Sequence, residues 1–409
     1  MDTPDQSLAL HIAFWCACAS VVTDIVSIAA CQILLGAAVL AFLVSRTRLR
    51  MPPVGWPALT FFGLTVISWA ASREWHDGRP QIKKFYVWLL LFVLYQVVRK
   101  ADQARWLFWS CAVAGAINAA WALRQYILKY QNAARLHRDF YEMYVGDRIK
   151  GYQSHWMTFS GVEMIVMLML AALLLYVPIK KWAPAYWASG VLMMTTIILS
   201  GTRGVWVATA IAGMYLIWTW RPKLVILVPV ALVGIYFISP VNIQRRVESI
   251  YRPDKKVDSN EFRTVTRRTG LEMMKAHPLL GVGPEMVGRN FTRYLPADIT
   301  DPLPPGYYQH LHNIYIHYGA ERGIPALLAL LWFFARALYD FLRTLRKPQL
   351  PPVTRAILCG AVAVVIAILV EGLVEVNLGD SEVLALFLGV IACGYAAVEE
   401  QTEHVVIPA

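Results

Sequence analysis

Residues 156–177 read WMTFSGVEMIVMLMLAALLLYV, an apolar run with one charged residue, Glu163. A transmembrane helix needs about 20 consecutive, mostly apolar residues, so this run is long enough to cross a membrane once. Similar runs recur along the chain, and we predict about twelve spans in an all-α polytopic membrane protein. The predicted spans are 7–22, 25–45, 55–72, 84–98, 104–128, 156–177, 182–200, 203–219, 223–239, 323–342, 353–374 and 382–398.

The overall composition agrees with a membrane protein. Of the 409 residues, 57% are hydrophobic and 16% are charged, and the mean hydropathy is +0.48. A typical soluble domain is about 25% charged, so this composition excludes a disordered chain and disfavours a cytosolic enzyme. The net charge of +11 would suggest nucleic acid in a soluble protein, but here we expect no nucleic-acid partner. All six cysteines lie in apolar stretches and predict neither a disulfide framework nor a cysteine metal site.

Short basic loops predict the orientation of the chain. Lys and Arg gather in the short loops near 46–50, 99–105, 221–223 and 343–355, and such loops face the cytoplasm. Both termini are then cytoplasmic. The chain divides into spans one to nine (1–239), an outer loop with short helices that carries the catalytic residues (240–322), and spans ten to twelve with a cytoplasmic tail (323–409). Within the outer loop, apolar periodicity predicts a helix over 261–276, which His277-Pro278 ends.

The outer side is also basic, against the usual charge bias. An anionic ligand at this face would explain the excess of Lys and Arg. The alternative is that long loops do not follow the positive-inside rule. The spacing of four residues places Arg263 and Arg267 on one face of the predicted helix. The outer residues that we regard as candidates for substrate binding are Lys83, Lys84, Arg148, Lys150, Arg267 and Arg268.

A histidine-rich segment, residues 307–313, stands just before the tenth predicted span. An imidazole is the usual general base near neutral pH, so His312 could activate a sugar hydroxyl. Two alternatives are a histidine that is simply tolerated at an interface and a zinc site that uses His310 and His312. The outer side shows no acidic cluster, and no helical His motif accompanies these residues, so we expect no bound metal.

Arg203 occupies a five-residue turn, Ser200-Gly201-Thr202-Arg203-Gly204, between two predicted spans. A guanidinium in such a restrained place offers a bidentate fork for phosphate. The alternative is an arginine at a helix end whose side chain extends toward the interface. The flanking glycines favour a shaped anion site.

Three stretches together resemble the bacterial O-antigen ligase family, within the superfamily that also holds O-antigen polymerases and oligosaccharide transferases to protein. The first is residues 199–206, LSGTRGVW, and the second is Arg263 with residues 276–284, AHPLLGVGP. The third is His312-Asn313 followed, after nine residues, by Gly323. Ala326 departs from the Gly, Thr or Tyr that the family pattern has three positions later, which weakens the distinction between ligase and polymerase.

The resemblance implies a glycosyltransferase-C-like fold and an activity at the periplasmic face of the inner membrane. Such an enzyme moves O-antigen glycan from undecaprenyl diphosphate to a sugar hydroxyl of lipid A–core, without cofactor or metal and with inversion. Arg203, Arg263 and His312 are the positions that match the family's catalytic residues, and Asn313 joins the substrate-binding set.

Two other functions remain open at this stage. A polymerase would use the same donor but a second lipid-linked glycan as acceptor. A transporter of lipid-linked glycan would place ionisable residues within the membrane and often shows repeated halves. The candidates for such residues are Arg124, Glu163, Glu371 and Glu375, and the sequence shows no repeat.

Overall fold

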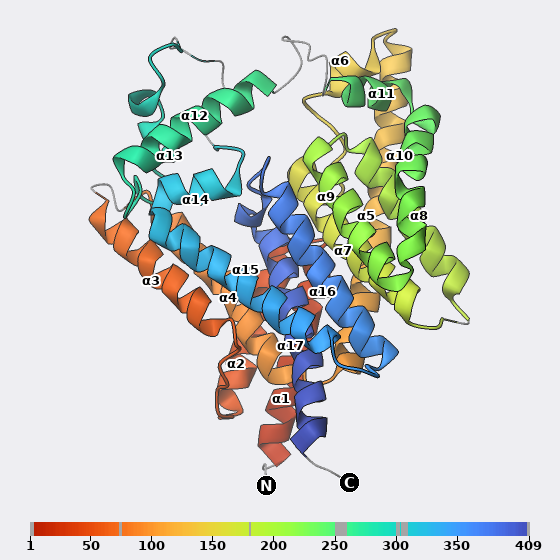
Figure 1. Ribbon diagram of the computed structural model, residues 1–409, viewed down its shortest axis with the longest axis vertical. Coiled ribbons are helices and arrows are strands. Elements are labelled where there is room, and N and C mark those ends of the chain that lie inside the picture. Colours follow the sequence, from red (N-terminus) through yellow and green to blue (C-terminus); the bar gives the residue numbers. More distant parts are fainter. Residues whose placement is uncertain are drawn as a thin grey trace.

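The structure is a computed structural model that describes residues 4–72, 76–179, 181–249, 260–299, 303 and 310–406. Every regular element in these ranges is a helix, which confirms the predicted all-α class (Figure 1). Helices are expected in a bilayer because the hydrocarbon core offers no water to hydrogen-bond the backbone.

Each predicted span coincides with a helix or with a helix that follows a 3-10 turn. Six of these helices are long and apolar enough to cross a membrane, and four apolar segments are shorter. The described chain is therefore consistent with a polytopic membrane protein, whereas the number twelve stays a prediction. The helices are α1 (Pro4–Asp24), α2 (Ile28–Val44), α3 (Gly55–Ala71), α4 (Arg79–Val97), α5 (Ala101–Arg135), α7 (Trp156–Tyr176), α8 (Ala183–Leu199), α9 (Arg203–Trp220), η1 (Pro222–Ile226), α10 (Leu227–Ile238), α15 (Ile324–Leu345), α16 (Pro352–Glu371) and α17 (Ser381–Val406).

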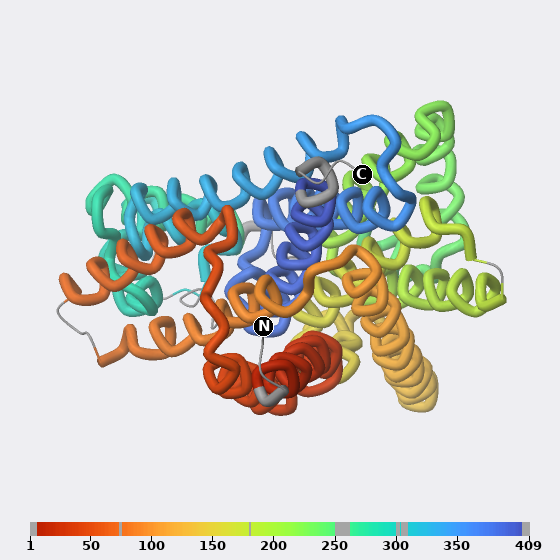
Figure 2. The backbone as a smooth tube through the Cα atoms, turned by 90° about the horizontal axis from the view of Figure 1, so that it is seen from below, coloured from red at the N-terminus to blue at the C-terminus, as the bar shows by residue number. Residues whose placement is uncertain are grey.

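The C-terminal helices form the centre of the bundle (Figure 2). Helix α16 packs against α7 and α9, while α17 packs against α4. Phe333 and Phe387 are fully buried there. Large apolar side chains such as Ile33 and Phe237 remain exposed on the outside of the bundle, as expected for helices that face lipid.

Shorter helices cover the end of the bundle opposite both termini (Figure 1). The predicted helix over 261–276 is confirmed by α12, which ends directly before His277-Pro278. At the other end, Arg50 and Arg99 from two of the basic loops lie 2.8 and 3.6 Å from the Glu399 carboxylate near the C-terminus. The shorter helices are α6 (Phe140–Tyr144), α11 (Val241–Glu248), α12 (Asn260–Ala276), α13 (Val287–Asn290), η2 (Thr292–Tyr294), α14 (Ile314–Arg322) and η3 (Asn377–Gly379).

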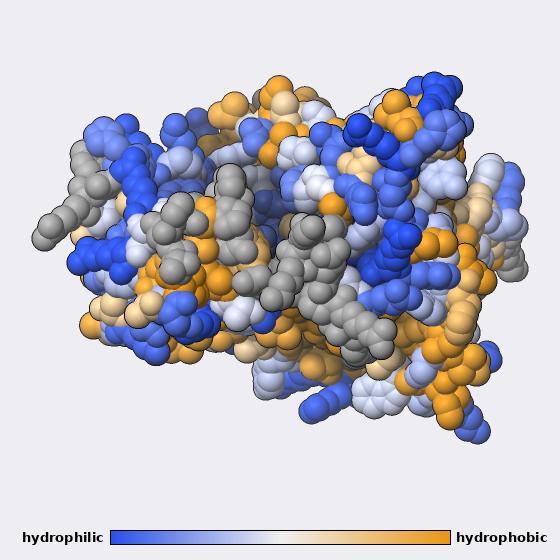
Figure 3. Space-filling model, turned by 90° about the horizontal axis from the view of Figure 1, so that it is seen from above, coloured by the Kyte–Doolittle hydropathy of each residue, from blue (hydrophilic) through white to orange (hydrophobic). Residues whose placement is uncertain are grey.

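This covered end carries groups of polar side chains. Hydrophilic side chains gather over the α12–α14 side and over the α6 and α11 side of the face (Figure 3). The sequence motifs singled out above meet at this end, because α9 begins here and α14 lies beside α12.

Candidate functional site

A hydroxyl cluster holds the tight turn between α8 and α9. The Ser160 hydroxyl of α7 lies 2.9 Å from the Ser200 hydroxyl and 3.0 Å from the Thr202 hydroxyl. Arg203 follows as the first residue of α9, is 8% exposed, and donates from Nη1 to the Ser249 hydroxyl at 2.9 Å. The turn therefore fixes the start of α9 and the backbone that carries Arg203.

Two further arginines converge on the same turn. Arg148 Nη1 and Arg246 Nε both donate to the Gly201 carbonyl, at 3.1 and 3.2 Å. Burial, together with the positive charges of Arg246, Arg203 and Arg263, lowers the pKa of Arg148 to about 9. The Arg148 guanidinium is thus close enough to three others to be repelled by them, an arrangement suited to an anion of more than one charge.

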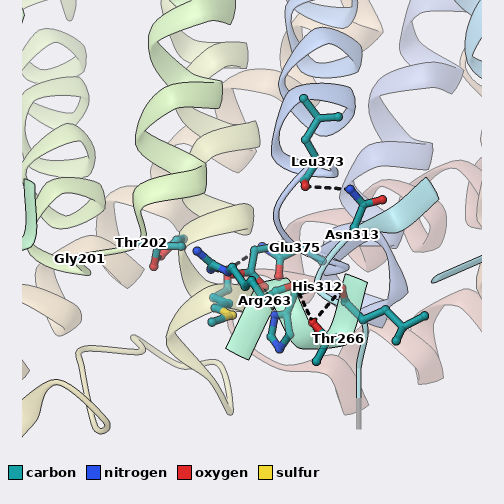
Figure 4. Close-up of polar contacts among 12 residues, drawn as sticks. Gly201, Thr202, Arg263, Thr266, His312, Asn313, Leu373 and Glu375 are labelled. Atoms are coloured by element: carbon teal, nitrogen blue, oxygen red, sulfur yellow. Dashed lines mark hydrogen bonds and ion pairs between the residues drawn. The ribbon is translucent and has the colours of Figure 1, made fainter. Parts of the chain in front are cut away.

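Glu375 connects the two other residues that the sequence motifs predict. Its carboxylate accepts a hydrogen bond from Arg263 and lies 2.8 Å from His312 Nδ1 (Figure 4). The Glu375 side chain is 2% exposed. Burial alone would raise its pKa, but the His312 hydrogen bond and the Arg263 charge outweigh burial, and the pKa lies below its ordinary value. Glu375 is therefore ionised at neutral pH and can orient the imidazole.

Helix α14 sets the position of His312. The His312 backbone is left-handed, with φ of 46°, which is uncommon for a residue other than glycine. Asn313 then caps the helix, because its Oδ1 accepts from the Ile316 amide at 2.9 Å. Its Nδ2 donates to the Leu373 carbonyl at 2.8 Å, which ties the helix start to the segment that carries Glu375. Asn313 thus holds His312 and Glu375 together through the backbone.

The nine-residue spacing to Gly323 is the length of α14, which runs Ile314–Arg322. Gly323 has φ of 87° and ψ of 162°, a conformation open almost only to glycine. A Cβ atom there would lie 2.1 Å from the Leu279 carbonyl oxygen. The Ile324 amide also donates to the Pro278 carbonyl at 2.8 Å. The second and third motifs are therefore packed together by their backbones.

We expect Gly323→Ala to destabilise the protein, because both the backbone conformation and the contact with Leu279 exclude a methyl group. The conformation alone costs about 1–3 kcal/mol. The melting temperature of the detergent-solubilised protein measures the effect. Gly63→Ala is the matched control, because a Cβ atom at Gly63 meets nothing within 4 Å. Equal melting temperatures for the two variants would contradict this account.

A second close approach brings the α9 turn to Glu375. A Cβ atom at Gly204 would lie 2.5 Å from Val374 Cγ2. Because Gly204 has no side chain, the 374–375 segment can pass close to the start of α9, next to Arg203. In Figure 4 the Arg263 side chain is drawn between Thr202 and Glu375, and it pairs with the Glu375 carboxylate.

A cavity of about 560 Å³ opens beside His312 and Glu375. Its other polar wall residues come from α4, the start of α7, α14 and the segment around η3. They include Gln81, Lys84, His155, Trp156, Thr158, His310, His317, Glu321, Asn377 and Asp380. A volume of this size is typical of small-molecule sites.

The predicted binding residues fall into two groups. Lys84 lines the cavity, Arg148 lies in the arginine cluster, and Arg267 donates to the Leu373 carbonyl at 2.6 Å. The others point elsewhere: Lys83 and Lys150 are exposed and are not wall residues, and Arg268 pairs with Asp298 at 2.7 Å on the surface. Of the histidine-rich segment, Tyr307, Tyr308 and Gln309 lie outside the described residues.

Three residues of the site were not assigned to it from the sequence: Glu375, Asp380 and Arg246. Glu375 appeared only as a candidate intramembrane charge, yet it lies between His312 and Arg263 at the end of the bundle opposite both termini. The expectation of an outer side without clustered acids was therefore wrong, because Glu375 and Asp380 line one cavity. One feature of the sequence could have indicated Glu375 and Asp380: both lie in a predicted outer loop without Lys or Arg.

The described residues contain no group of three His, Cys, Asp or Glu side chains placed to hold a metal ion. Glu375 has His312 and Arg263 as partners instead, and Asp380 accepts from the Thr158 hydroxyl at 2.6 Å. The positive charges at the turn between α8 and α9 come from Arg148, Arg203 and Arg246.

Comparison with known proteins gives a family match for part of the chain. No curated protein matches the chain significantly. Residues 188–331, however, match the family model described as O-antigen ligase. The matched range includes the Arg203 turn, Arg263, and α14 with His312 and Gly323. The match thus covers Arg203, Arg263 and His312, whereas Arg148, Glu375 and Asp380 lie outside it.

Proposed function

We propose that the protein is an O-antigen ligase at the periplasmic face of the bacterial inner membrane, with both termini in the cytoplasm. It transfers O-antigen glycan from undecaprenyl diphosphate to a sugar hydroxyl of lipid A–core. The observation that carries the proposal is the joining of His312 and Arg263 through Glu375, beside the arginine cluster. In this proposal His312 is the base and the arginine cluster is the anion site, and His312 lines the cavity of about 560 Å³.

The acceptor hydroxyl is activated by His312. Because Nδ1 of the imidazole faces the Glu375 carboxylate at 2.8 Å, the proton of the neutral ring belongs on Nδ1. Nε2 then carries the lone pair that takes the hydroxyl proton. The acceptor oxygen forms a bond to the anomeric carbon as the bond from that carbon to the diphosphate oxygen breaks. Attack opposite the leaving group inverts the anomeric centre.

The leaving diphosphate gains negative charge, which the arginines stabilise. Arg203 and Arg263 are the principal partners, and Arg148 contributes a further guanidinium in the same cluster. In the free protein Arg263 is hydrogen-bonded to Glu375. When the diphosphate binds, it either shares Arg263 with Glu375 or displaces Glu375 from Arg263.

An apolar cavity of about 760 Å³ between α7, α8, α9 and α10 suits the polyprenyl tail of the donor. It extends to Leu199, the residue before the Ser200–Gly204 turn. A tail in this cavity would bring its diphosphate to the arginine cluster from within the membrane.

The banding pattern of lipopolysaccharide from cells that lack the gene tests the function. Loss of all O-antigen-capped forms, restored by the wild-type gene, is the result expected for a ligase. A cap of a single repeat without a ladder would overturn this proposal in favour of a polymerase. An unchanged pattern would overturn both.

We expect transfer by the purified protein to survive EDTA, because arginines rather than a metal ion are proposed to neutralise the diphosphate. The measurement is the rate of glycan transfer with and without chelator. Activity that disappears with EDTA and returns with Mg²⁺, Mn²⁺ or Zn²⁺ would show that the charge is neutralised by a metal.

A further inference from the structure

The charges of the site are segregated. The arginine cluster lies at the α8–α9 turn, and Arg148, Arg203 and Arg246 are not among the wall residues of the 560 Å³ cavity. The cavity wall instead holds four carboxylates, from Glu285, Glu321, Glu375 and Asp380, with Lys84 as its lysine. Glu321 and Glu375 are each paired with an arginine, and the arginines of the cluster lie outside the wall. The space beside His312 therefore suits an uncharged ligand better than an anion.

Asp380 offers hydrogen-bond acceptors in this cavity. It stands directly before α17, and one carboxylate oxygen accepts from the Thr158 hydroxyl at 2.6 Å. Burial raises its pKa, while Lys84, His310 and His155 around it act in the opposite direction. These three neighbours come from α4, the segment before α14 and the segment before α7, so Asp380 lies where several walls meet.

Two wall residues have polar atoms that no described residue satisfies. The Trp156 indole Nε1 and His317 Nδ1 are both buried without a hydrogen-bond partner in the described part of the chain. His317 is 7% exposed, and burial lowers its pKa to about 4, so it is uncharged at neutral pH. Buried polar groups normally have partners, and a ligand with hydroxyl groups in this cavity would supply them here.

Sugar hydroxyls match this set, because each both donates and accepts a hydrogen bond. A carboxylate, an indole N–H and a neutral imidazole can bind neighbouring hydroxyls on one ring. His155, whose ring centroid lies 3.8 Å from that of Trp156, and Arg148, whose Cζ lies 5.1 Å from the Trp156 ring, fix the indole between the cavity and the arginine cluster.

We propose that Asp380, Trp156 and His317 form the subsite for an uncharged sugar ring of the acceptor, beside His312. The subsite rests on the proposed function, and it divides the site into an acceptor half with carboxylates and a donor half with arginines. Asp380 and Trp156 then determine which acceptor sugar is held with its hydroxyl near His312.

The test is steady-state transfer by the purified full-length protein. The probes are an undecaprenyl diphosphate-linked oligosaccharide as donor and purified lipid A–core as acceptor. We expect Asp380→Asn, which keeps the shape of the side chain, to raise the acceptor KM about tenfold or more, since a hydrogen bond to a charged group is lost. Trp156→Phe keeps an aromatic ring but removes the indole N–H together with the pyrrole part of the ring system, and it should raise the acceptor KM by a smaller factor. In both variants the donor KM should stay within about twofold of wild type.

Asp298→Asn is the matched control, because Asp298 is exposed and lies outside the cavity. Wild-type transfer with an unchanged acceptor KM in Trp156→Phe and in folded Asp380→Asn would overturn the subsite but not the proposed function. A raised donor KM with an unchanged acceptor KM would also overturn it. If Asp380→Asn does not fold, Trp156→Phe alone decides. Wild-type protein that cannot transfer between these probes would overturn the proposed function and the subsite with it.

Discussion

His312→Ala is expected to reduce glycan transfer by about 10²–10⁴-fold, because it removes the proposed general base. The protein should still insert and bind donor, since the arginine cluster does not depend on the His312 ring. The measurement is transfer in vitro at matched membrane levels, together with core-capping in cells. Near-normal capping by His312→Ala would exclude the proposed role.

Companion variants separate the base from its neighbours. His310→Ala and His317→Ala should be milder, because neither imidazole contacts Glu375 in the structure. Glu375→Gln keeps the shape of the side chain but removes the charge that orients the His312 ring, so it should lower kcat. A kcat equal to wild type in Glu375→Gln would show that the 2.8 Å contact with His312 is not used in the reaction.

Arg203→Lys and Arg263→Lys are each expected to lower transfer about a hundredfold, comparable to the loss of one oxyanion donor. Lysine keeps the positive charge but cannot form a bidentate pair with phosphate oxygens. Because both arginines are proposed to act on one diphosphate, the double alanine variant should lose less than the sum of the single variants. Transfer assays at matched protein levels give all of these values.

Arg268→Ala is the control for this series. Arg268 lies on the same helix as Arg263 but pairs with Asp298 on the surface, so its loss should be small. Arg267→Ala should also be milder than Arg263→Ala, since Arg267 reaches a backbone carbonyl at Leu373 rather than Glu375. Full activity of both lysine variants would show that charge alone suffices. A larger loss at Arg267 or Arg268 than at Arg263 would place the donor site elsewhere on α12.

The helices could be predicted from the sequence because apolar length and periodicity are local properties of the chain. The run 156–177 became α7, and the mixed spacing over 261–276 became α12. The spacing of four between Arg263 and Arg267 also predicted a shared face, and both side chains reach the 373–375 segment. The number of membrane crossings could not be predicted in the same way. Short apolar helices such as α3 do not show by their length whether they cross the membrane.

The partners in the site could not be predicted in the same way. Glu375 lies 112 residues from Arg263 and 63 from His312 along the chain, and no periodicity connects loops so far apart. The same limit applies to Arg246 and Gly201, which are 45 residues apart. Motif resemblance located Arg203, Arg263 and His312, but the acids that surround them come from a segment that no motif covers.

Helix α14 makes the number of residues between His312 and Gly323 matter, in addition to the identities of its buried residues. The helix is held at both ends, by the Asn313 cap and by the backbone contact of Gly323 with Leu279. One inserted residue would turn His312 by about 100° and move it about 1.5 Å along the axis, away from Glu375. Substitutions on the partly exposed side of α14 leave this register intact, whereas a single-codon insertion or deletion removes the base from its carboxylate. Related chains should therefore keep the length of this segment as strictly as the identities of its buried residues.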